Sequence, residues 1–292
     1  MPFNFQTFKT RTLTAVVFVV IMLSGLLINE WTFLALFSVM HFGCWIEYQK
    51  LICLVDNDYC STGSLHKYAA MLAGWGFMLW MTNDAFNIGI VHLYEIGWWL
   101  MLVMLIALPV ADLVSSKQFS LKNTGYSFLG LLYISLSCGL MINLRAEGII
   151  FFGSAVTIDL GWILPLVLVC SIWINDTMAY IVGSLIGKTP VSSISPRKTW
   201  EGTLGGALLA VAAITLAGYF WFGVADIISL VVISSLAAIM GTAGDFLESK
   251  LKRMAGVKDS GRILPGHGGF LDRFDSLLIA TIFVWLYVKL FL

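Results

Sequence analysis

The chain has 292 residues, of which 59% are hydrophobic and 12% charged, and its mean hydropathy is +0.89. Soluble domains are about 45–50% apolar and about 25% charged, so this composition excludes an ordinary soluble protein and is typical of a polytopic membrane protein. Intrinsic disorder is excluded because it requires low hydrophobicity. The 17 basic residues balance the 17 acidic ones, which argues against a nucleic-acid partner.

Nine apolar runs are long enough, at roughly 20 residues each, to cross a bilayer as helices. The chain is therefore predicted to be all-α and to form a single membrane domain over 1–292, with N-terminal helices over 1–160 and the polar motifs over 161–292. The predicted spans are 13–29, 31–47, 67–83, 97–114, 124–143, 161–187, 203–222, 226–246 and 275–292.

Lysine and arginine residues indicate how the chain is oriented, because they collect on the cytoplasmic side of membrane proteins. If the N-terminus is cytoplasmic, all of the 17 basic residues except Arg145 and Lys289 fall on that side. Nine spans keep this alternation and put the C-terminus outside. The segment from Arg145 to Gly161 is then an apolar outside loop, and the spans of the first half are expected to be poor in polar groups.

The first polar motif, Asn175 and Asp176, lies inside the predicted span 161–187. An ionised carboxylate in hydrocarbon costs several kcal/mol, so Asp176 is expected to face a polar cavity or a partner. The alternative is a structural pair in which Asn175 and Asp176 hydrogen-bond a neighbouring helix.

The second motif is the loop 188–202, in which hydroxyls and cations precede a helix that Glu201 opens. Its candidate phosphate ligands are Ser195, Arg197, Lys198 and Thr199. Backbone N–H groups and the dipole of a helix N-terminus favour bound phosphate. The alternative is that the basic residues only satisfy the positive-inside bias. Gly205 and Gly206, just beyond, are expected to let two helices approach closely.

The third motif, 244–275, lies between the last two predicted spans and is the densest in charge. Its carboxylates near the helix ends are Asp245, Glu248, Asp272 and Asp275. Six basic residues and the glycine turn 266–269 accompany them, and glycine allows a backbone to approach a ligand closely. Carboxylate oxygens suit Mg²⁺, and cations balance phosphate charge. The pattern favours a metal–phosphate site over a solvated charged loop.

From Ser249 to Asp275 the chain follows the pattern S-x-hydrophobic-K-R-x4-K-D-x-small-x2-hydrophobic-P-x-H-G-G-hydrophobic-x-D-R-hydrophobic-D at every fixed position. In this it resembles the phosphatidate cytidylyltransferase family, also called CDP-diacylglycerol synthases. The segments 175–180 and 195–202 also resemble motifs of that family, in the same order. Arg197 departs from the lysine that is commoner there, and the first half of the chain is similar only in hydropathy.

The resemblance implies the reaction CTP + phosphatidate → CDP-diacylglycerol + pyrophosphate. It implies Mg²⁺ bound by Asp245 and Asp272, K⁺ as a second cation in some members, and a multi-pass protein of a bacterial inner membrane whose site faces the cytoplasm. Family members can form homodimers. The residues that the resemblance marks as catalytic are Asp245, Lys258, Asp259, His267, Asp272, Arg273 and Asp275. Those it marks for binding substrate and phosphate are Asn175, Asp176, Ser195, Arg197, Lys198, Thr199, Lys252 and Arg253.

Two other functions stay open from the sequence. A CTP-dependent enzyme could act on another lipid acceptor, because the motifs do not specify the lipid. An ion-coupled transporter could use Asp176 as part of an ion path. Against transport, the charges gather in loops, and we find no repeated half with broken helices of the kind that transporters contain.

Overall fold

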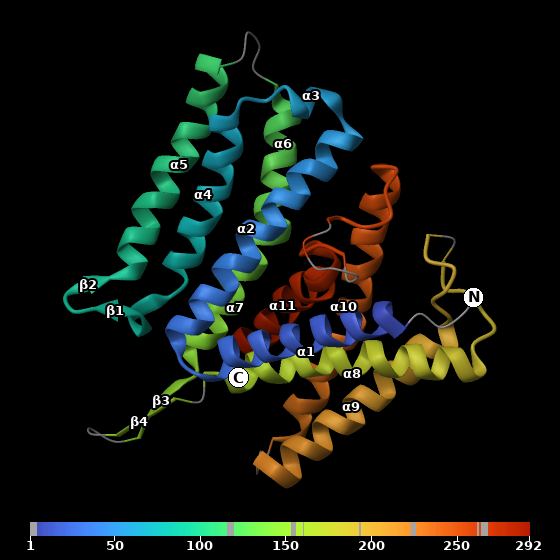
Figure 1. The fold of residues 1–292 in the computed structure, drawn as a ribbon. Helices are drawn as coiled ribbons and strands as arrows, with labels where there is room; N and C mark the ends of the chain where they lie inside the picture. The colour runs from blue at the N-terminus through green and yellow to red at the C-terminus, as the bar shows by residue number, and fades with distance from the viewer. Residues whose placement is uncertain are drawn as a thin grey trace. The chain divides into compact units, whose positions relative to one another are not determined.

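Each of the nine predicted apolar runs overlaps a helix in the computed structural model (Figure 1). Helices are expected there, because backbone polar groups in hydrocarbon must be satisfied within their own segment. The structure describes residues 5–115, 120–152, 156–159, 161–192, 194–222, 226–261, 263 and 268–292. These fall into two compact units, one of 1–162 and 254–274 and the other of 163–253 and 275–292.

Within the described residues, six helical segments are long and apolar enough to cross a membrane, and Thr12–Leu27 forms a shorter apolar helix. The six are Leu93–Ala111, Leu121–Glu147, Ile163–Ile186, Trp200–Phe220, Ile227–Met254 and Leu271–Phe291. The chain is therefore an all-α polytopic membrane protein, as predicted. The count of nine spans stays a prediction.

The first unit holds the N-terminal helices. They are α1 (Phe5–Leu27), α2 (Glu30–Val55), the short α3 (Asn57–Cys60), α4 (Ser64–Trp80), α5 (Leu93–Ser115), α6 (Leu121–Gly130) and α7 (Leu136–Glu147), with a π-helical turn, η2 (Leu131–Ser135), between the last two. A 3-10 turn, η1 (Asn83–Ala85), and a small hairpin of β1 (Asn87–Ile88) and β2 (Val91–His92) connect α4 to α5.

Helices α4 and α5 lie side by side and approach closely at two glycines (Figure 1). A Cβ atom on Gly76 would lie 2.6 Å from the backbone nitrogen of Met101, and one on Gly97 would collide with the backbone of Trp80. Small residues allow such backbone contact between membrane helices. The pair therefore depends on glycine on both helices.

Some polar side chains of the first unit are buried, whereas apolar side chains of α5 face outward. Trp99, Ile106 and Leu113 are 65–73% exposed at intervals of seven residues, which puts them on one face of the helix. His41 and Glu47 of α2 are at most 1% exposed. Apolar side chains on the outside of a helix bundle suit a lipid environment.

The segment between Arg145 and Gly161 was predicted to be a mostly apolar outside loop. The segment contains an antiparallel hairpin of β3 (Ile149–Phe152) and β4 (Val156–Asp159). Ile, Val, Thr and Phe dominate both strands, and β-branched and aromatic residues favour extended backbone.

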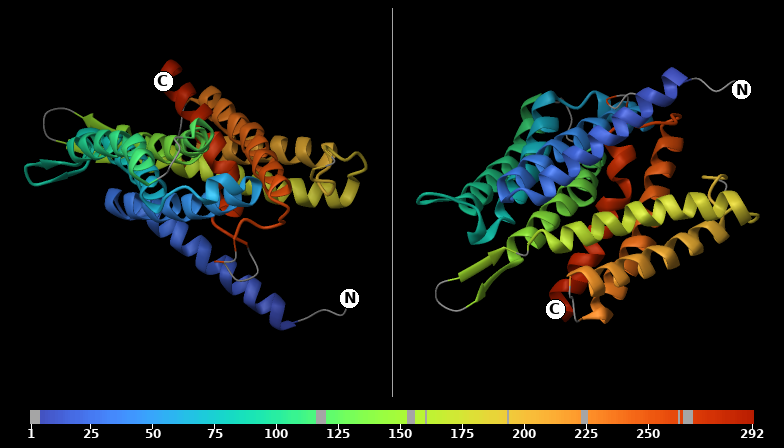
Figure 2. Two further views of the ribbon diagram at one scale, coloured as in Figure 1. Left: turned by 90° about the horizontal axis from the view of Figure 1, so that it is seen from above. Right: turned by 60° about the horizontal axis from the view of Figure 1, so that its bottom comes forward.

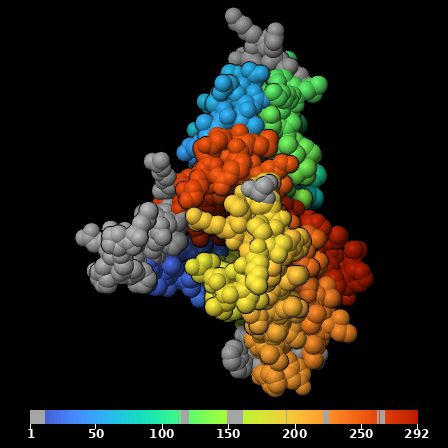
Figure 3. All heavy atoms as spheres, turned by 90° about the vertical axis from the view of Figure 1, so that its right-hand side faces the viewer, coloured from blue at the N-terminus to red at the C-terminus, as the bar shows by residue number. Residues whose placement is uncertain are grey.

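The second unit consists of α8 (Ile163–Ile186), α9 (Trp200–Phe222), α10 (Ile227–Met254, to Arg253) and α11 (Leu271–Phe291, from Asp275). Helices α8 and α9 run side by side, and the space-filling view shows their atoms in contact (Figures 2 and 3). A Cβ atom on Gly206 would lie 2.7 Å from the carbonyl oxygen of Asn175. This confirms the predicted close approach of helices at the Gly205–Gly206 pair.

Two helices continue beyond their predicted ends, since α2 extends past residue 47 to Val55 and α10 past 246 to Met254. The predictions end where charged residues begin, but a helix can continue outside hydrocarbon. In α10, Glu248 and Lys252 form an ion pair four residues apart, which favours the helical conformation. Ser249, Lys252 and Arg253 therefore lie on the continuation of α10 beyond the predicted span.

Candidate functional site

Asp245, on α10 of the second unit, forms an ion pair with Lys198 from the loop between α8 and α9. Its other oxygen, Oδ1, accepts a hydrogen bond from the Ser249 hydroxyl at 3.2 Å. The Lys198 ammonium also lies 5.2 Å from the centre of the Phe246 ring. An aspartate and a lysine from two of the predicted motifs are thus brought together.

Further carboxylates surround this ion pair. Asp275, 8% exposed near the start of α11, lies within electrostatic reach of Asp245, Lys252 and Asp176. Glycine at position 244 makes this possible, because a side chain there would collide with the carbonyl oxygen of Asp275. The second unit therefore gathers acidic and basic side chains from α8, α10, α11 and the α8–α9 loop.

The α8–α9 loop is a folded segment that directs Lys198 toward Asp245. Pro190 and Thr199 form an isolated β-bridge, and the Val191 N–H donates to the Lys198 carbonyl at 2.9 Å. The Glu201 carboxylate, in the first turn of α9, accepts from the backbone N–H groups of Lys188 and Thr189 at 3.1 and 3.2 Å. It also accepts from the Thr189 hydroxyl at 2.9 Å. Glu201 thus fastens the beginning of the loop to the helix that follows it.

The other predicted residues of this loop have different surroundings. The Thr199 hydroxyl accepts from the N–H of Gly202 at 3.2 Å, so it caps the N-terminus of α9. The Ser195 carbonyl accepts from the Lys198 N–H at 3.1 Å, which closes a turn before Lys198. Arg197 is exposed. Only Lys198 of the four candidates in this loop has a described ion pair with a carboxylate of α10.

Asp272 lies in the first turn of α11, in the part of that helix that belongs to the first unit. Its Oδ2 accepts from the N–H and the hydroxyl of Ser260, both at 2.9 Å, and from the N–H of Gly269 at 2.8 Å. Gly268 has a φ of +84°, and a Cβ atom there would lie 2.5 Å from Asp272 Oδ2. The glycine turn of the signature therefore approaches a carboxylate of the chain itself.

Glu47, on α2 of the first unit, is a site residue that sequence reasoning missed. Its Oε2 accepts from the Ser260 hydroxyl at 2.7 Å and from the Leu271 N–H at 3.0 Å. The expectation that spans of the first half are poor in polar groups was wrong here. The sequence did contain a signal for Glu47, because it ends the apolar run 31–47. An ionised carboxylate in hydrocarbon is costly there for the same reason as at Asp176.

The remaining predicted residues are distributed as follows. Asn175 is 3% exposed and donates from its amide to Asp176 Oδ1 at 3.4 Å, and Lys252 pairs with the fully buried Glu248. Arg253, Lys258, Asp259 and Arg273 are exposed. His267 lies outside the described residues. The predicted Asp245–Asp272 metal pair takes one carboxylate from each unit and stays a prediction.

The chemistry of these oxygens fits Mg²⁺ bound together with a phosphate ligand. Within the part of the chain that the structure describes, no group of three or more His, Cys, Asp or Glu could hold a metal ion alone. Mg²⁺ usually takes one or two carboxylates and completes its shell with water and substrate phosphate. Asp245, with Lys198 beside it, offers a carboxylate and a phosphate-binding cation in one place.

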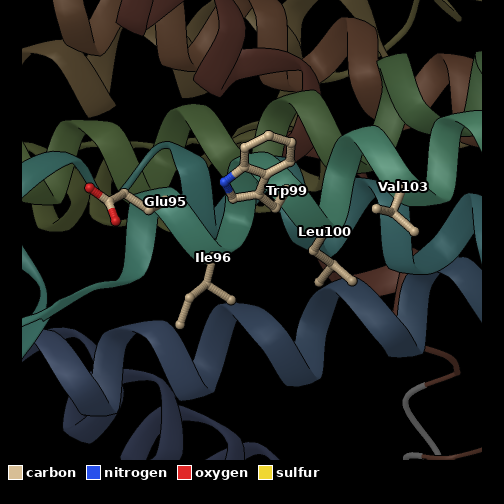
Figure 4. A pocket seen from close by; sticks show the side chains of 5 residues that line it. All are labelled: Glu95, Ile96, Trp99, Leu100 and Val103. Atoms are coloured by element: carbon tan, nitrogen blue, oxygen red, sulfur yellow. The ribbon is translucent and has the colours of Figure 1, made fainter.

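An unrelated hollow on α5 does not fit a charged substrate. It is lined by Glu95, Ile96, Trp99, Leu100 and Val103, all from that one helix (Figure 4). The lining is apolar except for one carboxylate, which would repel phosphate. Its composition is that of a lipid-facing helix surface.

The chain is similar to known proteins over nearly its whole length. A model described as "Cytidylyltransferase family" matches residues 9–291. The chain is 30% identical over 278 residues to a phosphatidate cytidylyltransferase of Staphylococcus epidermidis, covering 92% of this chain and 95% of that protein. It is 37% identical over 167 residues to one of Staphylococcus saprophyticus, covering 56% and 59%. Phosphatidate cytidylyltransferase 4, chloroplastic, of Arabidopsis thaliana is 35% identical over 181 residues, covering 60% of this chain and 46% of that longer relative.

Proposed function

Because the chain belongs to the cytidylyltransferase family, and is therefore a nucleotidyltransferase, we propose that it transfers the cytidylyl group of CTP to phosphatidate. The products are CDP-diacylglycerol and pyrophosphate. The relatives named above carry that activity in their names. The structural observation that carries the proposal is the ion pair of Lys198 with Asp245, since it joins a phosphate-binding cation to a carboxylate of the signature helix.

The proposed reaction needs no nucleophile from the protein. An oxygen of the phosphatidate phosphate bonds to the α-phosphorus of CTP, and the bond from that phosphorus to the bridging oxygen of the β-phosphate breaks. The attacking oxygen is already anionic, so no side chain has to remove a proton. Catalysis then consists of aligning the two phosphates and balancing their charge, as in other phosphoryl transfers.

Basic side chains supply the alignment. Lys198 exchanges Asp245 for a phosphate oxygen when substrate binds, since both side chains are about 30% exposed and such a pair is weak. Arg253, Lys258 and Arg273 are the other proposed phosphate contacts. His267 orients a phosphate or holds the glycine turn. Asp245 and Asp272 are the residues that would hold Mg²⁺, which would supply further charge neutralisation at the phosphates.

The substrates also suggest where the reaction takes place. Diacylglycerol chains stay in lipid, whereas CTP is dissolved in the cytoplasm. The positive-inside rule predicts that the three motifs lie on the cytoplasmic side, and the family resemblance implies a bacterial inner membrane. A site at that face, open toward the bilayer, is accessible to both substrates. A homodimer, and a second cation such as K⁺, are compatible with this proposal.

The test is pyrophosphate release by the purified protein in mixed micelles containing CTP, with and without phosphatidate, and with Mg²⁺ or EDTA. We expect release only with phosphatidate and Mg²⁺ together, and an equal amount of CDP-diacylglycerol. If pyrophosphate release depends instead on a different lipid phosphate or on a lipid alcohol, that lipid is the acceptor and not phosphatidate. A folded sample that releases no pyrophosphate with any of these acceptors would contradict the proposal.

A further inference from the structure

The buried carboxylate of Glu47 joins an N-terminal helix to the signature segment near the C-terminus. Its Oε2 binds the Ser260 hydroxyl, 213 residues further along the chain, and the Leu271 N–H, 224 residues further along. Glu47 itself is 1% exposed. All three residues belong to the first unit, so these contacts lie inside one compact part of the molecule.

The contact with Leu271 fixes the beginning of α11. Leu271 is the first residue of that helix, and its N–H is one of the donors that a helix N-terminus cannot satisfy internally. A carboxylate at this end is also favoured by the helix dipole. Asp272 is the next residue, so the group that holds Leu271 also determines where the Asp272 side chain begins.

The Ser260 hydroxyl that contacts Glu47 also contacts the Asp272 carboxylate. The Ser260 oxygen lies 2.7 Å from Glu47 Oε2 and 2.9 Å from Asp272 Oδ2, and the Ser260 N–H donates to the same Asp272 oxygen. Ser260 is itself 8% exposed. One serine therefore connects the two carboxylates, and its position is set by both.

Two glycines of the signature segment lie directly against the Glu47 carboxylate. A Cβ atom on Gly261 or on Gly269 would collide with the Glu47 carboxylate. Gly269 is also a donor to Asp272, at 2.8 Å. Gly261 and Gly269 thus both come within contact distance of the same carboxylate, which only glycine permits.

Stability alone is a poor explanation for this arrangement. Burying a carboxylate costs several kcal/mol unless charge partners and hydrogen bonds compensate for it. Glu47 Oε1 has no hydrogen-bond partner among the described residues, which adds to the cost of burying the group. A costly carboxylate whose described hydrogen bonds all go to the signature segment is better explained by the geometry of that segment.

We propose that Glu47 is a positioning residue: through Ser260 and the start of α11, it holds the Asp272 carboxylate in the orientation that the reaction requires. This inference rests on the proposed function only for what Asp272 does. It assigns to α2, which the signature does not include, a direct part in shaping the site.

The experiment compares the full-length variants Glu47→Gln and Ser260→Ala with the control Glu30→Gln, which makes the same exchange in the first turn of α2. The readouts are kcat, KM for CTP, and the Mg²⁺ concentration for half-maximal rate. Groups that orient a metal ligand typically account for 10–100-fold in activity or metal affinity. We expect kcat to fall by about 10–100-fold in both variants and the Mg²⁺ requirement to rise. KM for CTP at saturating Mg²⁺, and every property of Glu30→Gln, should stay close to wild type.

The double variant Glu47→Gln/Ser260→Ala sharpens the test. Because the Ser260 hydroxyl is one of the routes by which Glu47 acts on Asp272, the double variant should lose little more than the worse single variant. Losses that multiply, or a Glu47→Gln variant with wild-type kcat and Mg²⁺ requirement, would overturn the proposal. If Glu47→Gln does not fold, Ser260→Ala decides alone, since it leaves α2 intact; wild-type behaviour in that variant would overturn the proposal.

A readout without catalysis separates this inference from the proposed function. Lys258 is exposed in the segment after α10, so trypsin can report on how firmly this segment is held. If Glu47 holds the segment, cleavage after Lys258 should be at least about tenfold faster in Glu47→Gln, because two charge-assisted hydrogen bonds become weaker neutral ones. It should be unchanged in Glu30→Gln. Wild-type protein that releases no pyrophosphate would refute the function only, whereas unchanged cleavage in Glu47→Gln would refute the role of Glu47.

Discussion

Asp245 and Asp272, the two proposed metal ligands, are held in different ways. Asp245 pairs with Lys198, a long side chain at the end of a loop, and both partners are about 30% exposed. Asp272 Oδ2 accepts from the backbone N–H groups of Ser260 and Gly269 at 2.9 and 2.8 Å. It also lies 2.9 Å from the Ser260 hydroxyl, whose single proton it shares with the buried Glu47 carboxylate. A partly exposed ion pair exchanges partners easily, whereas several short hydrogen bonds fix a direction. One carboxylate is therefore suited to release its partner on substrate binding and the other to remain in place.

The largest expected effect comes from removing either carboxylate. Asp245→Ala and Asp272→Ala should each abolish turnover, with losses in kcat of at least about 10²–10³-fold, because electrostatic groups at the reacting phosphates contribute that much. Expression and folding in detergent should be retained. Pyrophosphate release and a thermal unfolding scan measure the two properties. Substantial activity in one variant would remove that carboxylate from the proposed metal site and end the comparison.

Lys198→Met tests whether the partner of Asp245 is exchangeable. Removing the cation should raise KM for CTP or phosphatidate and lower kcat/KM by about 10²-fold, since charge-assisted phosphate contacts are strong. The Mg²⁺ requirement should not rise, because Asp245 loses only a competitor. This is the opposite of the rise expected for Ser260→Ala. Lys188→Met, in the same loop, is the matched control; an equal loss there would mean that any basic residue near the helix end suffices.

Glu201→Ala should disturb the position of Lys198, the partner of Asp245, without removing it. It removes the three hydrogen bonds that fasten Lys188 and Thr189 to α9. We expect kcat/KM to fall by about tenfold, as for other residues that orient a site without touching it. Steady-state kinetics in the mixed-micelle assay measure the change. A loss as large as that of Lys198→Met would show that Glu201 has a direct role, and no loss would show that the loop keeps its shape without it.

The sequence predicted the parts of this site that are local. Hydropathy located the helices because spanning segments must be continuous, and the Lys198 and Asp245 motifs were recognised from their residues. The Glu47 contact was missed because its partners lie more than 200 positions away. The same argument that singled out Asp176 applies to Glu47, but its place at the end of an apolar run resembled an ordinary helix boundary. Which side chains meet across such distances depends on packing that residue patterns do not encode.

The smallest expected effect concerns the packing of the α8–α9 pair, whose connecting loop carries Lys198. In Gly206→Ala the new methyl group would lie 2.7–2.8 Å from atoms of Asn175 and Ala179, so the helices must separate. Overpacking of this kind costs about 1–3 kcal/mol, which should lower the apparent Tm in detergent. Gly125→Ala is the control, because no described atom lies within 4 Å of its new Cβ and helix propensity favours alanine by about 0.5–1 kcal/mol. If Gly206→Ala keeps the wild-type Tm but loses activity, the spacing of α8 and α9 serves the position of Lys198 more than stability. If it lowers the Tm and leaves the Mg²⁺ requirement unchanged, the Asp245 half of the site tolerates movement that the Asp272 half, held by Glu47 and Ser260, should not.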